Sequence, residues 1–362
     1  MSSSSSKTAM PNTNLEILPV KARYPWNRVI GGIASLILIG FLASSIGSVD
    51  IPLLQSVKIV INKLPGIELP TSWSNEWETI LWQLRIPRVV LAAIVGATLA
   101  MSGATYQGVF RNPLADPYLI GVAAGAGLGA TVMLATPLGN LMSITTFLPI
   151  AAFVGALLAV FITYSVAKNT GGLPITTLIL AGVAVSSLMA AATTLIMMLG
   201  DDDLRPILSW LLGGFIEANW TKCALTVIYV LPAAALIVIY GRVLNVMQLE
   251  EGHANQMGVN TERTKFLLIL GASLATAGAV SFSGLIGFVG LIAPHAVRLI
   301  WGTDYRTLIP MAALSGAGIL IIADLAARTI ISPTELPVGV VTAFFGAPFF
   351  LYLLRRGIRF GL

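Results

Sequence analysis

Ten runs of apolar residues along the chain are each close to the length that an α-helix needs to cross a bilayer. A helix needs about 20 apolar residues to span the roughly 30 Å hydrocarbon core. In lipid, only helices and closed barrels satisfy all of their own backbone hydrogen bonds. We therefore predict an all-α integral membrane protein with spans near residues 29–47, 88–109, 116–136, 146–167, 174–198, 222–241, 264–281, 285–301, 307–330 and 337–354.

The composition excludes the soluble classes of protein. Hydrophobic residues make up 56% of the 362 residues and charged residues 10%, against about 45–50% and about 25% in soluble proteins. The mean hydropathy is +0.87. A soluble fold could not cover so much apolar surface with 21 basic and 16 acidic side chains. Disordered, collagen-like, coiled-coil and disulfide-rich classes are excluded on the same grounds.

The distribution of Lys and Arg predicts how the chain is oriented. Ten spans place both termini on one side, and with the N-terminus in the cytoplasm 14 of the 21 basic residues lie inside. This excess supports N-in and C-in by the positive-inside rule. The basic residues left outside are Lys58, Lys63, Arg85, Arg88, Arg205, Lys222 and Arg328. An outer aromatic belt is predicted from Trp73, Trp77, Trp82, Trp210 and Trp220.

The sequence also predicts a simple domain organisation. Residues 1–27 are expected to be a disordered cytoplasmic tail, 28–357 the ten-helix domain with a cytoplasmic loop over 242–265, and 358–362 a cytoplasmic end. Ser102-Gly103 precedes Pro113 by the spacing at which Ser283-Gly284 precedes Pro294. This is the pattern of an inverted five-helix repeat, as in many transporters. Chance similarity between Gly-rich helices explains it equally well.

No set of residues indicates an active site or a metal site. The chain has no P-loop for ATP and no H-E-x-x-H motif, no Ser/His/Asp set and no paired carboxylates. His253 and His295 are far apart, and the single cysteine, Cys223, is expected to be an apolar filler. The pI of about 9.4 would favour nucleic-acid binding in a soluble domain. Here most cations flank the spans, so orientation in the bilayer explains it and no nucleic-acid partner is expected.

One charged pair lies within a predicted span. Asp324 and Arg328 are four residues apart and therefore share a helix face. Membrane-embedded charge often marks a proton or sodium relay. A structural ion pair is as good an interpretation. If the pair is a relay, the chain is an ion-coupled secondary transporter; an intramembrane enzyme or a scaffold is a further alternative.

Three polar or irregular stretches carry the most specific signal. The first holds R-x-P-R at Arg85–Arg88 and N-P-L-A-D-P at Asn112–Pro117. The second is the loop 242–265, in which Leu249, Ala254 and Met257 could form a short apolar face. The third combines G-F-x-G-L-x-x-P-H at 287–295, A-D at 323–324 and E-L-P-x-G-x-x-T at 335–342. In this order and spacing, the motifs closely resemble the permease subunits of the iron-chelate and vitamin B12 uptake family of ABC importers (FecCD-like, type II importers).

The resemblance covers about residues 30 to 357 and implies a set of partners. Such permeases dimerise with a second permease subunit around a central pathway in the lipid bilayer. Separate ABC ATPase subunits bind the ATP and Mg, so no cofactor is expected on this chain. An extracytoplasmic substrate-binding protein delivers the cargo. The implied location is the plasma (inner) membrane of a prokaryote.

The resemblance also implies roles for individual residues. Binding-protein docking falls on Arg85, Arg88 and Arg328, although interfacial anchoring or pairing with Asp324 would explain them too. Contacts with the ATPase fall on Glu250, Glu251, Ala254, Met257 and Gly258, where Leu249-Glu250-Glu251 departs from the usual Leu-Gly-Glu. The cytoplasmic gate falls on Asn112, Leu114, Ile175 and Thr176.

We therefore expect a transport subunit and not an enzyme. Its cargo would be a metal chelate, with a ferric siderophore first and vitamin B12 or haem as the alternative. It would move that cargo from the binding protein to the cytoplasm by alternating access.

Overall fold

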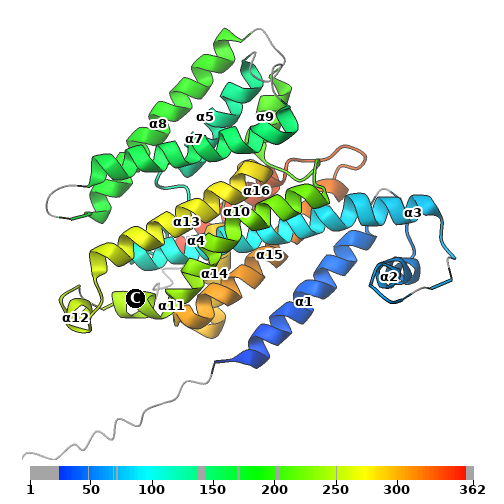
Figure 1. The fold of residues 1–362 in the computed structure, drawn as a ribbon, viewed down its shortest axis with the longest axis horizontal. Coiled ribbons are helices and arrows are strands. Elements are labelled where there is room, and N and C mark those ends of the chain that lie inside the picture. Colours follow the sequence, from blue (N-terminus) through cyan, green and yellow to red (C-terminus); the bar gives the residue numbers. More distant parts are fainter. Residues whose placement is uncertain are drawn as a thin grey trace, which may run out of the picture.

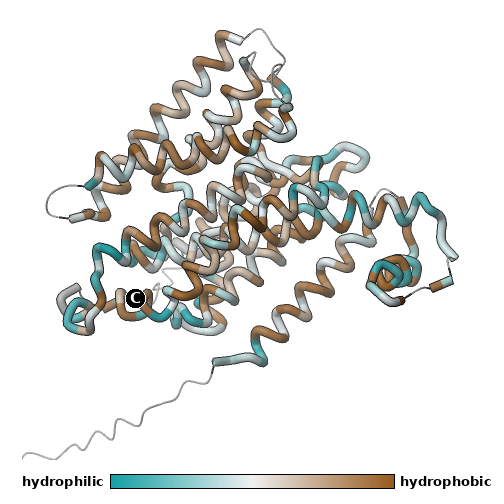
Figure 2. The backbone as a smooth tube through the Cα atoms, viewed as in Figure 1, coloured by the Kyte–Doolittle hydropathy of each residue, from teal (hydrophilic) through white to brown (hydrophobic). Residues whose placement is uncertain are grey.

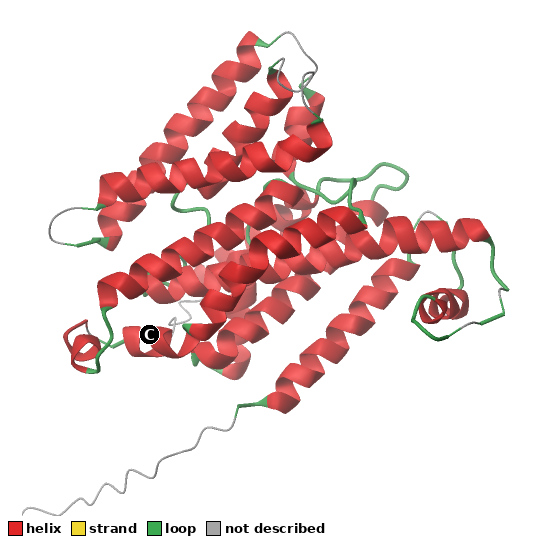
Figure 3. Ribbon diagram, in the orientation of Figure 1, coloured by secondary structure: helices red, strands yellow, loops and turns green. Residues whose placement is uncertain are grey.

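The computed structural model describes residues 24–47, 49–67, 69–70, 72–136, 143–168, 172–200, 204–249 and 251–355. In these residues the regular structure is helical and no strand is present (Figure 3). Most of the predicted tail 1–27 lies outside the described residues. So does the predicted end 358–362. The first helix begins at Trp26, inside the segment predicted as tail.

Each predicted span contains one helix. The ten are α1 (Trp26–Ser45), α4 (Ile86–Val109), α5 (Val122–Ala135), α7 (Ile144–Ala167), α8 (Ile175–Leu199), α10 (Trp220–Ile239), α13 (Thr261–Ser283), α14 (Val289–Trp301), α15 (Tyr305–Thr329) and α16 (Val338–Arg355). Seven helical segments of the described chain are long and apolar enough to cross a membrane, and the seven include α3 to α4 as one segment. The helices α5, α14 and α16 are shorter. The chain is a multi-pass membrane protein.

The helix predicted to open at Arg88 begins much earlier. It starts with α3 (Asn75–Thr79), continues through a π-helical segment, η1 (Ile80–Arg85), and runs on into α4. The side chain of Ser74 caps α3 by accepting from the N–H of Trp77. Pro87 lacks an N–H and would break a regular helix. In η1, just before it, the carbonyl of Trp82 accepts instead from the indole N–H of Trp220 at 2.9 Å.

Two helices are shorter than predicted because the chain next to them forms turns. The span predicted from residue 116 gives a helix only from Val122, and the span predicted from 285 gives one only from Val289. Between α13 and α14 the chain is unwound, with φ of +67° at Gly284 and +68° at Phe288. The boundary predicted between residues 281 and 285 is therefore a break between two helices.

Four shorter helices lie between the spans, and only the last of them falls where the sequence suggested a short helix, in the loop 242–265. They are α2 (Leu53–Asn62), α9 (Arg205–Leu212), α11 (Gly241–Met247) and α12 (Glu251–Gln256). In Figure 1, α11 and α12 lie at one end of the bundle and α2 and α3 at the opposite end. We refer to these as the α12 end and the α3 end. At the α3 end, the predicted belt residues Trp82 and Trp220 are in ring contact, with centroids 5.2 Å apart.

The helix α4 lies at the centre of the main bundle. It packs against α10, α13, α14 and α15, while α5, α7 and α8 form a second group (Figure 1). Small residues allow the closest approaches: a Cβ on Gly103 would lie 1.9 Å from the carbonyl oxygen of Gly290 on α14. Such small residues at contacts are usual between membrane helices. Figure 2 colours much of α1 and α8 as hydrophobic, and both helices have several large apolar side chains that are exposed.

The two halves of the predicted repeat occupy different settings. Ser102 and Gly103 lie within α4, whereas Ser283 ends α13 and Gly284 begins the unwound stretch. The match between these two short motifs therefore gives no support to an inverted repeat.

Candidate functional site

The loop predicted to contact the ATPase is a structured segment at the α12 end. It contains α11, α12 and a turn that ends at Gly258, whose φ of +82° is the left-handed geometry that ends many helices. Met257 is 63% exposed and Leu249 47% exposed, whereas Ala254 is fully buried. Ala254 therefore supports α12 from within. Glu250 lies outside the described residues, and Glu251 is the first residue of α12.

This segment is bonded to the carboxyl end of α4. The Arg111 guanidinium donates from Nε to the carbonyl of Met247 at 2.8 Å and from Nη2 to that of Leu249 at 2.5 Å. The Gln248 amide donates to the carbonyl of Gly108 at 3.1 Å. Side chains that bond main-chain carbonyls thus hold the end of α4 to residues 241–258, which we call the docking segment after its predicted role.

A second set of contacts ties the segment to the start of α15. Asn245 donates to the Asp304 carboxylate at 2.6 Å and accepts from the N–H of Tyr305 at 2.9 Å. Asp304 caps α15 by accepting from the N–H of Arg306. Hydrogen bonds from the Arg306 guanidinium hold the pKa of Asp304 below its ordinary value.

The predicted gate sequence after α4 folds into two successive turns of one kind. The Asn112 side chain accepts from the N–H of Leu114 at 2.9 Å, and the Asp116 side chain accepts from the N–H of Tyr118 at 2.8 Å. A proline follows each of these residues, which is favourable for such turns. Asn112 is exposed and Leu114 half-buried.

The other predicted gate residues lie at the start of α8. Ile175 is half-buried and packs against the main core, and Thr176 is exposed. Just before them, the N–H of Leu173 donates to Glu262 of α13 at 3.0 Å. Within the described residues, no hydrogen bond or ion pair joins the Asn112–Leu114 turn to Ile175 and Thr176. Their joint role as a gate stays a prediction.

Beyond the second turn, Tyr118 bonds to the break between α13 and α14. Its hydroxyl donates to the carbonyl of Ile286 at 2.9 Å and accepts from the N–H of the same residue at 3.1 Å. One side chain therefore satisfies both main-chain groups of a residue that has no helical partners. Sequence reasoning missed this role, because nothing in the motif indicates where the hydroxyl points.

The arginines predicted for docking come together at the α3 end, and Arg88 is at the centre of an ion network. Its Nε donates to the two carboxylate oxygens of Asp324 at 2.9 and 3.1 Å, and its Nη1 to those of Glu335 at 3.1 and 2.9 Å. The Arg88 side chain is 11% exposed, Asp324 1% and Glu335 34%. Glu335 is thus the member of this network that is open to solvent.

Arg85 and Arg328 bind the carboxyl end of α1. Arg85 donates to the carbonyls of Ser44 and Ser45, and Arg328 to those of Ala43 and Ile46. A helix leaves its last carbonyls without partners inside the helix. Two guanidinium groups, from the end of η1 and from α15, therefore supply the missing donors and the positive charge that this end of a helix favours.

The alternative predicted for Arg328 is also present. Its Nε lies 3.6 Å from Asp324 Oδ2, so the spacing of four residues does give an ion pair. The stronger partner of Asp324 is Arg88, which the sequence did not indicate. Arg88 and Asp324 are 236 positions apart in the chain, so no local sequence pattern indicates their contact.

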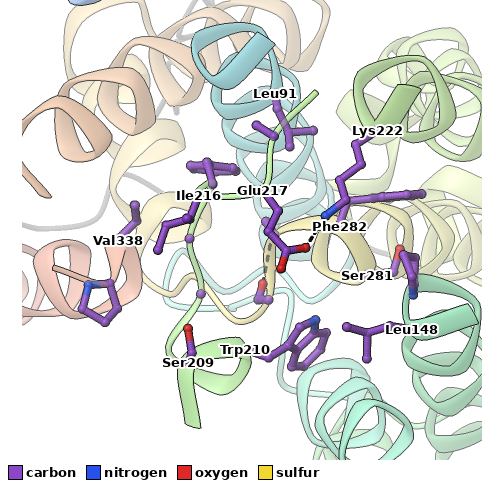
Figure 4. Close-up of a pocket in the computed structure, with 18 of the residues that line it drawn as sticks. Leu91, Leu148, Ser209, Trp210, Ile216, Glu217, Lys222, Ser281, Phe282 and Val338 are labelled. Carbon is purple, nitrogen blue, oxygen red and sulfur yellow. Dashed lines mark hydrogen bonds and ion pairs between the residues drawn. The ribbon is translucent and has the colours of Figure 1, made fainter. Parts of the chain in front are cut away.

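A cavity of about 410 Å³ opens at the same end, close to Arg88 and Glu335. Its walls come from α4, α7, α9, the loop before α10, the end of α13 and the start of α16. Figure 4 shows Glu217 and Lys222 pointing toward one another across part of it, with Nζ and Oε2 2.7 Å apart. Trp210, Ser281 and Phe282 also line the cavity. Among the described residues, no group of three His, Cys, Asp or Glu could hold a metal.

The sequence from residue 35 to 356 matches the model of the FecCD transport family. The chain belongs to this family. As a FecCD permease it is a transport subunit of the type II importer class, which agrees with the resemblance drawn from its motifs. The match covers every described helix from α2 onward and the second half of α1.

This FecCD chain is similar in sequence to several ABC transporter permeases. It is 45% identical over 283 residues to the cobalamin import system permease BtuC of Halobacterium salinarum, covering 78% of this chain and 75% of that protein. It is 42% identical to the uncharacterized ABC transporter permease YvrB of Bacillus subtilis, covering 91% and 95%. It is 38% identical to the hemin transport permease HmuU of Yersinia pestis, covering 80% and 89%.

A solved structure has the same fold. That chain is described as an inward-facing conformation of an ABC transporter of metal-chelate type, and it is 29% identical with a TM-score of 0.77. The alignment covers 92% of this FecCD chain and all of the solved one.

Proposed function

We propose that this FecCD chain is the membrane-spanning permease of an ATP-driven importer that carries a metal chelate into the cell by alternating access. The observation that carries the proposal is the family match over residues 35–356. The structured segment with exposed Leu249 and Met257 at one end of the bundle supports it, because an ATPase needs such a surface.

In this proposal the chain crosses the plasma (inner) membrane of a prokaryote ten times, with both termini in the cytoplasm. The short helices α5 and α14 then count as spans together with the turns that precede them. The α12 end faces the cytoplasm, in keeping with the positive-inside rule. Arg28, Arg111, Arg242 and Arg306 lie at helix ends that this orientation places inside.

The proposed partners follow from the importer class. Two ABC ATPase subunits bind ATP and Mg and contact the α11–α12 segment, and a second permease subunit completes the pathway. The chain itself holds no cofactor in this proposal. An extracytoplasmic binding protein docks at the α3 end, where Arg85, Arg88 and Arg328 lie together.

The geometry of the arginine cluster refines the docking proposal. Arg85 and Arg328 are committed to main-chain carbonyls of α1, whereas Arg88 reaches the surface next to Glu335. A carboxylate on the binding protein would approach Arg88 from the side that Glu335 now occupies. Such charge pairs steer encounter and set the register of docking.

The cargo is a metal chelate, and two classes are to be tested. A ferric siderophore is one, and cobalamin or haem the other. The relatives described above that have a named cargo are a cobalamin and a hemin permease. The solved structure is described only as metal-chelate type, so these relatives support both classes.

The experiment that tests the function is affinity purification of the tagged chain from its native membrane, followed by reconstitution in liposomes. An ABC ATPase in stoichiometric amount, and ATP-dependent accumulation of cyanocobalamin, hemin or a ferric siderophore, are expected. Uptake that persists without ATP but is abolished by Asp324→Asn would instead indicate an ion-coupled secondary transporter.

A further inference from the structure

The turns between α4 and α5 are bonded at both ends to other parts of the chain. At one end Arg111 bonds the carbonyls of Met247 and Leu249, and at the other Tyr118 bonds Ile286. The first partner belongs to the docking segment at the α12 end. The second belongs to the unwound break between α13 and α14.

We propose that residues 111–118, hereafter the strap, transmit movement of the ATPase-docking segment to the break between α13 and α14. Arg111 and Tyr118 are the positioning residues at its two ends. This inference rests on the proposed function, since it requires an ATPase that moves the docking segment.

The strap is built to move as one piece. Its two side-chain turns are reinforced by main-chain bonds, from the N–H of Ala115 to the carbonyl of Asn112 and from that of Leu119 to Asp116. Pro113 and Pro117 fix two of its φ angles. An element with few free torsions passes on a displacement, whereas a flexible loop absorbs it.

At the docking end, Arg111 is held in an uncommon conformation. Its φ of +49° lies in the left-handed region, which non-glycine residues seldom adopt. This geometry accompanies a guanidinium that spans two carbonyls at the carboxyl end of α11, where a cation is favoured. Because both partners are main-chain atoms, Arg111 follows the backbone of the docking segment itself.

At the other end, Tyr118 contacts a stretch that borders the cavity. Ile286 is 1% exposed, and Gly284, two residues before it, lines the cavity wall together with Ser281 and Ser283. Pro117 lies against the first turn of α14, since a Cβ on Gly290 would be 2.8 Å from its ring. A shift of the docking segment would thus reach the cavity wall through a short, bonded route.

The test places a reporter at the cavity wall. Ser281→Cys in a Cys223→Ala background gives one thiol there, and its rate of maleimide labelling is measured in the complex with the ATPase, with and without ATP and vanadate. With an intact strap we expect the rate to change about fivefold or more between the two states, the range of a coupling between sites. If the labelling rate is the same in both states of a complex that hydrolyses ATP, the proposed role of the strap is wrong.

Variants then interrupt the two ends. Arg111→Gln and Tyr118→Phe should each abolish the nucleotide-dependent change while the ATPase stays bound and still hydrolyses ATP. Because both cut the same connection, the double variant should be no worse than either single one. Additive effects would contradict the proposal, and so would loss of the ATPase from the Arg111→Gln complex.

Matched controls complete the design. Arg242→Gln removes an exposed guanidinium from the same docking segment, and Tyr164→Phe removes a hydroxyl from α7; both should keep the change in labelling. If Arg111→Gln fails to fold, Arg111→Lys decides, since one ammonium group does not reproduce the two-carbonyl geometry of the guanidinium. If no ATPase copurifies with the unmodified chain, the proposed function is wrong, and the proposed role of the strap, which depends on it, is wrong as well.

Discussion

Arg88 and Asp324 lie 236 positions apart in the chain and form a buried ion pair, with Nε and Oδ1 2.9 Å apart. The pair joins α4 to α15 at the α3 end. Removing one partner of a buried pair leaves the other charge uncompensated in a medium of low dielectric. The pair therefore gives a direct prediction for stability.

Asp324→Asn should lower the free energy of unfolding by about 3–5 kcal/mol, the cost of breaking a buried pair. Both Arg88 and Arg328 lose their shared carboxylate. Unfolding of the purified protein in mixed detergent would measure the effect. Glu217→Gln is the control, because Glu217 is 75% exposed and exposed pairs contribute about 1 kcal/mol or less. Equal stability of the two variants would contradict the structure.

The contact between α4 and α14 should not tolerate a methyl group. A Cβ at position 103 would overlap the Gly290 carbonyl, so Gly103→Ala should cost at least about 1–3 kcal/mol, as overpacking does. Gly31→Ala is the matched helical control, because no atom lies within 4 Å of its added Cβ. The yield and melting temperature of the two proteins in detergent provide the measurement. A Gly103→Ala protein as stable as the Gly31→Ala control would show that the helices are further apart.

Docking should become stronger when Glu335 loses its charge. In Glu335→Gln the Arg88–Asp324 pair remains, but the carboxylate that occupies the exposed side of Arg88 is gone. An acidic patch on the binding protein should then associate several-fold faster at low salt, because rim charges act mainly on the association rate. Surface plasmon resonance against salt concentration is the measurement. An unchanged or slower association would remove Arg88 from the docking surface.

The stability of the protein should depend on pH through the carboxyl group of Asp304. Its folded pKa is lowered from 3.8, chiefly by hydrogen bonds from Arg306. A carboxyl with a depressed folded pKa stabilises the fold above its unfolded pKa, and this contribution is lost as the pH falls through the folded value. Asp304→Asn keeps a good capping residue, so it should be less stable than the wild type at pH 7 and approach it below about pH 4.

Melting temperatures between pH 7 and pH 3 would check this. Arg306→Gln should weaken the same pH dependence, since it removes the main cause of the shift. A difference between wild type and Asp304→Asn that stays constant across the range would rule out the charge as its origin.

Hydropathy located the helices because each of them must present apolar residues to lipid or to another apolar helix. It misplaced the starts of α5 and α14 because Asp116 and Leu285 lie in apolar surroundings without being helical. The sequence pattern shows which stretches are apolar, but it does not show at which residue the helical hydrogen bonds begin. The amphipathic helix α2 was not predicted, because its ten residues are too few to cross a membrane and the search looked only for spans.

The site was predictable only in part. Motif resemblance placed Arg85, Arg88 and Arg328 in one functional group, and the structure brings them to one end. Their hydrogen-bond partners could not be predicted, because Arg85 and Arg328 donate to main-chain carbonyls and every residue type has such a carbonyl. The two-ended role of Arg111 and Tyr118 depends on atoms more than a hundred residues away in the chain.

The fastening of α1 bears on how the chain assembles during synthesis. Its carboxyl end is held by Arg328, whose acceptors lie 282 and 285 positions earlier. This bond can therefore form only after the 282 residues that follow Ile46 up to Arg328 have been synthesised, by which time α1 is already in the bilayer. Until then only lipid and early neighbours surround it, which makes the closing of α1 onto α15 a late event in the biogenesis of the subunit.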